Sequence, residues 1–288
     1  MILNASGCLD ALTAPGTARQ QDAFVTKTVT PLPRAGNAPV RIAETDVGML
    51  NSIGLANPGR ERFLAQTLPR LRELARPIWV SVGGFAAHEY AETCARLEDV
   101  TIELNLSCPN VDEAPESAAE IVAACRAATS LPLYAKLSPA SWDVAAVAQA
   151  VEDAGADGLS LVNTIRGLAL DGELRPKLGT RTGGLSGPAL KPIALAAVHA
   201  CYRATSLPIV GMGGVQTGRD ALELFAAGAT AVALGTVLFT DPSAPTRIRE
   251  ELAAELAAHG LSSSLDAVGI AHAEPLPARK HLDLGSRV

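Results

Sequence analysis

The sequence predicts one (β/α)8 TIM barrel that spans residues 1–288, and three observations support this fold class. Eight short runs of β-branched and apolar residues alternate with seven or eight segments of helical spacing, which is the pattern of such a barrel. The length of 288 residues suits one barrel, and no change in composition marks a second domain. Polar residues and glycines recur where the β runs end, at the edge where barrels build their sites. A doubly wound open sheet is the main alternative.

The predicted strands are short and are bounded by glycine, proline or polar residues. The fourth starts at Thr101 and breaks at Cys108-Pro109, because the residue before a proline is steered away from helical geometry. The other seven are expected at residues 1–5, 23–30, 77–84, 131–138, 157–163, 207–212 and 230–234.

Helices are expected between these strands, at residues 60–76, 86–96, 118–130, 142–154, 188–204, 217–227 and 243–259. Local signals set several of their ends: Pro188 is tolerated in a first turn, Thr217 can cap a helix, and Gly155 is a stop signal. Two longer connections, 31–59 and 164–187, are predicted as loops because turn residues and charges interrupt them. Such long loops inside a compact domain are more often functional than not.

Composition and charge exclude several classes of protein. A hydrophobic fraction of 48% and a charged fraction of 19% predict a folded chain rather than a disordered one. The formal net charge of −6 argues against a nucleic-acid partner, because phosphate backbones attract a surplus of lysine and arginine. The longest nearly apolar stretch, residues 229–239, is shorter than the roughly 18 residues that a membrane-spanning helix needs. Five cysteines without a C-x-x-C pair predict neither a disulfide framework nor a metal site, and they indicate a reducing, cytoplasmic location.

The polar residues and glycines at the predicted strand ends should meet at one rim of the barrel. Two lysines and two asparagines among them indicate a site for an anion and for a flat polar ligand. Structural pairing of buried charges inside the barrel is the alternative interpretation. The set comprises Ser6, Lys27, Gly83, Asn105, Lys136, Asn163, Gly213 and Gly235.

Glycine-containing turns follow the last two predicted strands, at Gly213-Gly214 and at Gly235-Thr236. Barrels commonly bind phosphate at these positions, through bare N–H groups and a following helix N-terminus. Cys108 lies just past the end of the fourth strand, and a thiol can transfer a proton near neutral pH if its pKa is lowered. The residues alone therefore predict an enzyme that binds a phosphorylated ligand, and they leave open whether that ligand is a substrate or a cofactor.

Several motifs, spread over most of the chain in family order, resemble those of the class 1 (soluble) dihydroorotate dehydrogenases. They are Asn4-Ala5-Ser6-Gly7-Cys8, Thr26-Lys27-Thr28, Asn51-Ser52-Ile53-Gly54-Leu55, Asn105-Leu106-Ser107-Cys108-Pro109-Asn110, Ala135-Lys136-Leu137-Ser138-Pro139, Val162-Asn163-Thr164, Thr182-Gly183-Gly184-Leu185-Ser186-Gly187 and Gly211-Met212-Gly213-Gly214-Val215. The loop at 34–59 and the last of these motifs are most similar to subclass 1B, which reduces NAD through a partner subunit. The resemblance implies oxidation of dihydroorotate to orotate in pyrimidine biosynthesis, with FMN as the cofactor.

The resemblance also implies a role for each matching residue. FMN would be held by Ser6, Lys27, Thr28, Asn105, Lys136, Val162, Gly187, Gly213, Gly214, Gly235 and Thr236. Dihydroorotate would be held by Lys27, Asn51, Ser52, Ile53, Gly54, Leu55, Asn105, Asn110, Asn163 and Thr164. Cys108 would be the base that removes the C5 proton while C6 gives a hydride to flavin N5, and Lys136 would stabilise negative charge on the reduced ring.

The partners and the substrate are further expectations from the resemblance. It implies a partner subunit that carries FAD and a 2Fe–2S centre, in a homodimer or a heterotetramer. The alternatives are a dehydrogenase of another dihydropyrimidine, such as dihydrouracil, and a non-redox lyase or isomerase that acts on a phosphorylated substrate. The sequence departs from the family's pattern in two places: no lead-in hairpin precedes the first strand, and the candidate lid at 111–117 is short and acidic.

Overall fold

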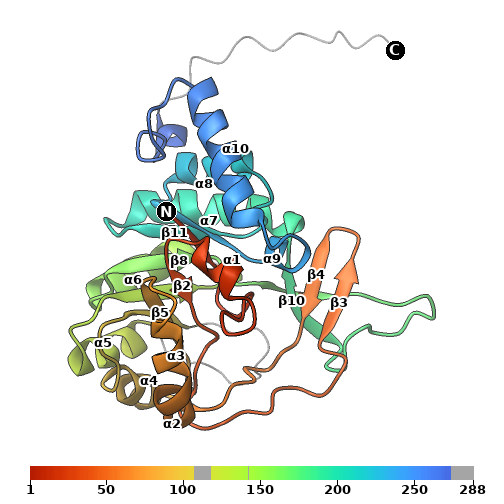
Figure 1. Ribbon diagram of the computed structural model, residues 1–288, viewed down its shortest axis with the longest axis vertical. Coiled ribbons are helices and arrows are strands. Elements are labelled where there is room, and N and C mark those ends of the chain that lie inside the picture. The colour runs from red at the N-terminus through yellow and green to blue at the C-terminus, as the bar shows by residue number, and fades with distance from the viewer. Residues whose placement is uncertain (107–117, 142, 274–288) are drawn as a thin grey trace.

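Eight parallel strands form a barrel in a computed structural model that describes residues 1–106, 118–141 and 143–273 (Figure 1). Their order around the barrel is β1, β12, β11, β8, β7, β6, β5 and β2. Each strand overlaps one of the eight predicted runs, which confirms the predicted fold class. The strands are β1 (Ile2–Asn4), β2 (Phe24–Val25), β5 (Ile78–Val82), β6 (Thr101–Asn105), β7 (Leu133–Leu137), β8 (Gly158–Leu161), β11 (Ile209–Met212) and β12 (Ala231–Leu234).

The two ends of this sheet, β1 and β2, meet through few backbone contacts. Leu3 and Ala23 form an isolated parallel bridge. The buried side chain of Asn4 completes the junction: its Nδ2 donates to the carbonyl of Val25 at 2.7 Å, and the N–H of Val25 donates to its Oδ1 at 2.9 Å. An amide side chain offers one donor and one acceptor, as a backbone peptide does, so it can stand in for a rung of the ladder.

Helices surround the barrel at the predicted places. They are α2 (Arg60–Arg62), η1 (Phe63–Thr67) and α3 (Leu68–Arg72) in one continuous segment, then α4 (Ala87–Cys94), α5 (Ala118–Ala128), α6 (Val144–Asp153), η2 (Pro188–Leu190) leading into α7 (Lys191–Ala204), α8 (Gly218–Ala227) and α10 (Ala244–Ala258). The first segment changes to π-helical geometry at η1, just before Pro69, which has no N–H to continue the helical ladder. The sequence did not predict α1 (Pro15–Arg19), α9 (Val237–Thr240) or η3 (Ile270–His272), because such short pieces carry no full period of apolar spacing.

The core has an outer and an inner layer. Ile102 and Leu104 of β6 belong to the cluster that packs the strands against the helices. Trp79 and Tyr134 belong to the smaller cluster inside the barrel, with ring centroids 4.4 Å apart. Side chains alternate along a strand, so Glu103 lies on the inner face of β6 while its neighbours Ile102 and Leu104 face outward. A carboxylate is therefore buried inside the barrel, below the strand ends.

The two long connections form a second sheet, so the prediction that they are loops was wrong. Each contributes two strands to an antiparallel sheet of order β3, β4, β10 and β9, which we call the arm sheet. The strands are β3 (Ile42–Thr45), β4 (Gly48–Asn51), β9 (Ile165–Leu168) and β10 (Thr182–Ser186). In Figure 1, β3, β4 and β10 lie beside one another at one side of the barrel. Gly48 permits this pairing, since a Cβ there would lie 2.0 Å from the carbonyl oxygen of Ser186.

Neither a membrane-spanning helix nor a metal-binding cluster occurs in the described residues. No helix there is long and apolar enough to cross a bilayer. No group of three or more histidine, cysteine, aspartate or glutamate side chains in that part of the chain is arranged to hold a metal ion.

Candidate active site

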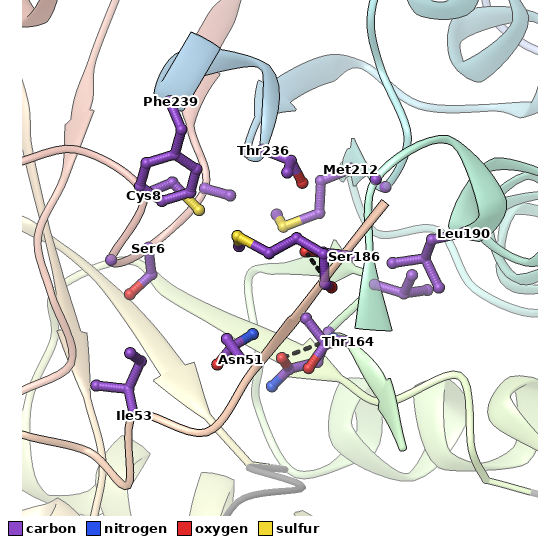
Figure 2. A pocket seen from close by; sticks show the side chains of 18 of the residues that line it. Ser6, Cys8, Asn51, Ile53, Thr164, Ser186, Leu190, Met212, Thr236 and Phe239 are labelled. Carbon is purple, nitrogen blue, oxygen red and sulfur yellow. Dashed lines mark hydrogen bonds between the residues drawn. The ribbon is translucent and has the colours of Figure 1, made fainter. Parts of the chain in front are cut away.

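A cavity of about 240 Å³ opens where the C-terminal ends of the barrel strands meet the arm sheet (Figure 2). Almost all of the predicted site residues that the structure describes line it. They are Ser6, Lys27, Thr28, Asn51, Ile53, Gly54, Leu55, Asn105, Lys136, Val162, Asn163, Thr164, Gly187, Gly213, Gly214, Gly235 and Thr236. Side chains from distant parts of the sequence therefore converge on one rim, as expected for parallel strands that close into a barrel.

A chain of amide and hydroxyl groups runs along one wall of this cavity. Asn105 donates through Nδ2 to Thr28 Oγ1 at 3.2 Å and accepts at Oδ1 from Asn163 Nδ2 at 3.1 Å. The backbone N–H of Thr164 donates to Asn163 Oδ1 at 2.8 Å, and Tyr90 Oη donates to the carbonyl of Asn105 at 2.9 Å. The bonds to the two side-chain amides fix their orientations, and the Tyr90 bond holds the backbone of Asn105, so the wall presents preorganised donors and acceptors that do not titrate.

A buried ion pair lies beneath the cavity. Lys136 on β7 is 6% exposed, Glu103 on β6 is 1% exposed, and Nζ lies 3.7 Å from Oε1. The sequence left open that buried charges pair structurally inside the barrel, and Lys136 and Glu103 do form such a pair. Lys136 nevertheless also lines the cavity. Its ammonium is therefore anchored from below while remaining available to a ligand above. Lys27 also lines the cavity and packs its stem over Gly7, where an added Cβ would lie 2.9 Å from Lys27 Cδ.

Glycine turns bound the cavity after β11 and β12. Gly213 has φ +125° and Gly214 has φ +77°, conformations that side chains other than glycine rarely adopt. The N–H groups of Gly213, Gly214 and Gly235 have no backbone acceptor among the residues that the structure describes. Bare N–H groups at such turns bind oxyanions. The geometry thus supports the predicted phosphate position.

Two predicted residues do not line the cavity. Ser52 is buried on the other side of its segment, where its hydroxyl accepts from Asn37 Nδ2 at 2.8 Å and lies 2.5 Å from Thr180 Oγ1. The Ser52 side chain therefore joins two loops, and its contact with substrate stays a prediction. Gly83 lies under Thr28, because an added Cβ there would be 2.7 Å from Thr28 Cγ2. Gly83 thus lets the backbone after β5 lie close to Thr28, and it does not itself line the cavity.

Two further predicted residues, Cys108 and Asn110, lie outside the described residues, as does the candidate lid at 111–117. Their roles stay predictions. The strand that leads to them ends at Asn105, whose side chain lines the cavity.

Sequence reasoning missed several residues that line the cavity, among them Cys8, Met49, Ser186, Met212 and Phe239. Burial raises the pKa of the Cys8 thiol, although the two neighbouring lysines oppose this shift. Figure 2 shows both Cys8 and Phe239 among the residues that line the cavity, and Phe239 is 52% exposed. Met212 could have been found from its place directly before the glycine pair, whereas Met49 and Ser186 belong to the unpredicted arm sheet.

Comparison with known proteins identifies the family. A family model described as dihydroorotate dehydrogenase matches residues 1–256. The chain belongs to this family. The dihydroorotate dehydrogenase B (NAD(+)) catalytic subunit of Listeria monocytogenes (strain EGD-e) is 46% identical over 256 residues, which cover 85% of this chain and 84% of that protein. The protein of the same name from Geobacter sp. (strain M21) is 46% identical over 259 residues, covering 86% and 85%.

A solved structure shows the same fold. Dihydroorotate dehydrogenase from Eimeria tenella, in complex with ferulenol, superimposes with a TM-score of 0.79 over 95% of this chain and 85% of that chain. Its sequence identity is 24%, so this likeness bears on the fold alone. The family match makes the chain a flavin-dependent oxidoreductase of the dihydroorotate dehydrogenase family, most similar to the NAD-linked B type, rather than a lyase or an isomerase.

The residues around the cavity fit the FMN on which this family depends. The glycine turns supply bare N–H groups for a phosphate, and the two lysines and the amide wall can face a flat, hydrogen-bonding ring system. Gly235 is not crowded by its neighbours, because an added Cβ would make only ordinary contacts with Cys8 Sγ at 3.6 Å and Ala5 Cβ at 3.7 Å. The wall there is bare backbone, to which a bulky ligand can approach closely.

Proposed function

We propose that this chain oxidises dihydroorotate to orotate in pyrimidine biosynthesis, as the catalytic subunit of an NAD-linked enzyme. The observation that carries the proposal is the convergence of Lys27, Lys136, Asn105 and Asn163 with the two glycine turns on one cavity. These groups match a phosphorylated flavin and a small anionic ring substrate in charge and in hydrogen-bonding capacity.

The glycine turns would hold the phosphate of FMN, and the other proposed cofactor residues would hold its ring system. Bound there, FMN would supply the hydride acceptor for the oxidation of dihydroorotate. Lys136 places a positive charge close to the ring site, and Glu103 keeps that ammonium in place at 3.7 Å. A fixed positive charge at this position favours a ligand that becomes more negative during the reaction.

Dihydroorotate would lie against the amide wall and the segment that follows β4. Asn51, Asn105 and Asn163 can each donate and accept hydrogen bonds without exchanging protons with the substrate. Lys27 would pair with the carboxylate of the substrate. Asn51, at the end of β4, and Ile53, in the segment that follows, close this side of the cavity, so they would exclude water from the reacting atoms.

Cys108 is the proposed base for the C5 proton. Its support comes from the sequence: it follows Asn105 by three residues, and Asn105 lines the cavity. A free thiol has a pKa of about 8.5, so a reaction that needs the thiolate should accelerate as the pH rises toward that value.

The electron acceptor is proposed from the relatives. The similar curated proteins are catalytic subunits of an NAD(+) enzyme. This sequence has no C-x-x-C pair to hold an iron–sulfur cluster and no dinucleotide-binding glycine motif. We therefore infer a second subunit that carries FAD and a 2Fe–2S centre, in a heterotetramer built on a homodimer of this chain, located in the cytoplasm.

An anaerobic absorbance titration tests the proposed function. The purified protein should be yellow, and dihydroorotate should bleach the flavin band in a stoichiometric titration, whereas dihydrouracil should not. NAD should restore the band only when the partner subunit is present. A colourless protein that does not bind added FMN would contradict the proposal, and bleaching by dihydrouracil alone would favour the other dihydropyrimidine. Rapid re-oxidation of the isolated chain by fumarate would instead argue against an NAD-linked partner.

A further inference from the structure

One carboxylate on α8 holds the residues that directly follow the glycine turn after β11. Asp220 Oδ2 accepts from the backbone N–H groups of Gln216 and Thr217, both at 2.9 Å, and from Thr217 Oγ1 at 3.0 Å. The Thr217 hydroxyl in turn accepts from the N–H of Asp220, which completes a capping box at the start of α8. Gln216 lines the cavity two residues after Gly214, so these bonds set the path of the chain directly beyond the turn.

The second oxygen of this carboxylate pairs with a cation from the neighbouring helix. Lys191 Nζ, at the start of α7, donates to Asp220 Oδ1 at 2.6 Å and also lies 3.0 Å from Glu223 Oε2. Gly214 packs on the stem of this lysine, since an added Cβ would lie 2.7 Å from Lys191 Cβ. The lysine therefore contacts the turn through its stem and the carboxylate through its tip.

Asp220 and Lys191 carry opposite charges. Burial alone would raise the pKa of Asp220, but hydrogen bonds from Lys191, Gln216 and Thr217 hold it below its usual value. Hydrogen bonds with Asp220 and Glu223 raise the pKa of Lys191. Both groups are thus charged at neutral pH. An unpaired carboxylate close to an anion would repel it, and Lys191 removes much of that repulsion.

An arginine links the two segments that follow the glycine turns. Arg247 on α10 donates through Nη1 and Nη2 to the carbonyl of Gln216, at 3.2 and 3.1 Å. Its Nε donates to Asp241 Oδ2 at 2.8 Å, and Asp241 directly follows α9, the short helix after Gly235-Thr236. One guanidinium thus links the segment after β11 to the segment after β12. Its planar fork makes such two-sided contacts with little freedom to shift.

We propose that Asp220, Lys191 and Arg247 are positioning residues that hold the two glycine turns in the shape that receives the phosphate of FMN. This inference rests on the proposed function, because it takes the cavity to be the FMN site. None of the three needs to touch the cofactor. They act through the N–H groups of the turns, which bind an oxyanion well only when they point at one place.

Comparison of FMN with riboflavin isolates this role, since riboflavin has the same rings and lacks the phosphate. The variants are Asp220→Asn, Lys191→Met and Arg247→Met, prepared as apo-protein and titrated with each flavin by fluorescence quenching. Loss of one charge-assisted contact should weaken FMN binding by about 10-fold or more. Riboflavin binding should change by no more than about 2-fold, as for substitutions away from a binding contact.

Arg249→Met is the matched control. Arg249 lies on the same helix as Arg247 and pairs with Asp22 at 3.0 Å, an Arg–Asp contact that reaches neither glycine turn. The control should leave the affinities for both flavins unchanged. Equal weakening of FMN and riboflavin in the test variants, or unchanged FMN affinity, would overturn the proposal.

Two further outcomes separate this inference from the proposed function. Wild-type protein that binds neither flavin contradicts the proposed function itself. If wild-type protein binds riboflavin as tightly as FMN, the cavity is still a flavin site, but the glycine turns do not bind the phosphate and this inference is wrong. If Asp220→Asn does not fold, Lys191→Met decides the matter, because its side chain is 30% exposed and its loss leaves no cavity in the core.

Discussion

Replacing Glu103 with glutamine should destabilise the protein strongly, because it leaves the buried ammonium of Lys136 without its carboxylate partner. Glu103 and Lys136 are almost fully buried, and their charged atoms lie 3.7 Å apart. At an effective dielectric constant of 20, this separation gives an attraction of about 4 kcal/mol. Removing one partner of a buried pair typically costs about 3–5 kcal/mol, since the other charge stays desolvated. We expect a decrease of that size in the free energy of unfolding.

Urea unfolding of the apo-protein measures this effect in a double-mutant cycle. Glu103→Gln and Lys136→Met should each be destabilised, and the double variant should be more stable than the sum of the two losses predicts, since it contains no unpaired buried charge. Ser160→Ala is the matched control: Ser160 neighbours Lys136 across β7 and β8, and its buried hydroxyl has no hydrogen-bond partner in the described structure. The control should cost little. Additive losses, or a Glu103→Gln effect below about 1 kcal/mol, would refute the reasoning.

Three further changes give separate tests. Gly214→Ala should weaken FMN binding more than riboflavin binding, because φ is +77° and the new Cβ would lie 2.7 Å from Lys191 Cβ; flavin titration measures this. Ser52→Ala should lower the free energy of unfolding by about 1–2 kcal/mol, because it loses its contacts with the two loops. The KM for dihydroorotate should stay unchanged, and a large rise in KM would show that Ser52 contacts the substrate. Cys8 should react slowly with iodoacetamide at neutral pH and faster as the pH rises, since burial raises the pKa of its thiol and keeps it protonated. Peptide mass mapping of the labelled apo-protein measures this, and fast labelling of Cys8 at pH 7 would contradict the prediction.

The barrel and its rim could be predicted because both depend on local patterns. Strands such as β6 and β7 show apolar residues bounded by turn residues, and a parallel barrel brings their C-terminal ends together whatever the loops do. Lys27, Lys136 and Asn105 were therefore found from their place at strand ends. This argument needs no contact between residues that are distant in the sequence.

The arm sheet could not be predicted as a whole: β3 and β4 form a local hairpin, but the pairing of β4 with β10 joins segments that lie far apart in the sequence. Leu50 of β4 pairs with Leu185 of β10, and neither run is regular enough to predict a strand by itself. The place of Ser52 outside the cavity lining could not be foreseen for the same reason. Side chains alternate along an extended chain, so Asn51 and Ile53 face the cavity while Ser52 faces away. Cys8 was missed because it lies in a turn, where no periodicity indicates the direction of a side chain.

The rate of flavin reduction by dihydroorotate, measured by anaerobic stopped flow across pH, tests the central claim most directly. Wild-type protein should be reduced quickly, with a rate that rises as the Cys108 thiol ionises. Cys108→Ser should retain its flavin spectrum and lose most of that rate near neutral pH, because a serine hydroxyl is a far weaker acid than a thiol. Undiminished reduction in Cys108→Ser, or no reduction of bound FMN by dihydroorotate in wild type, would contradict the account.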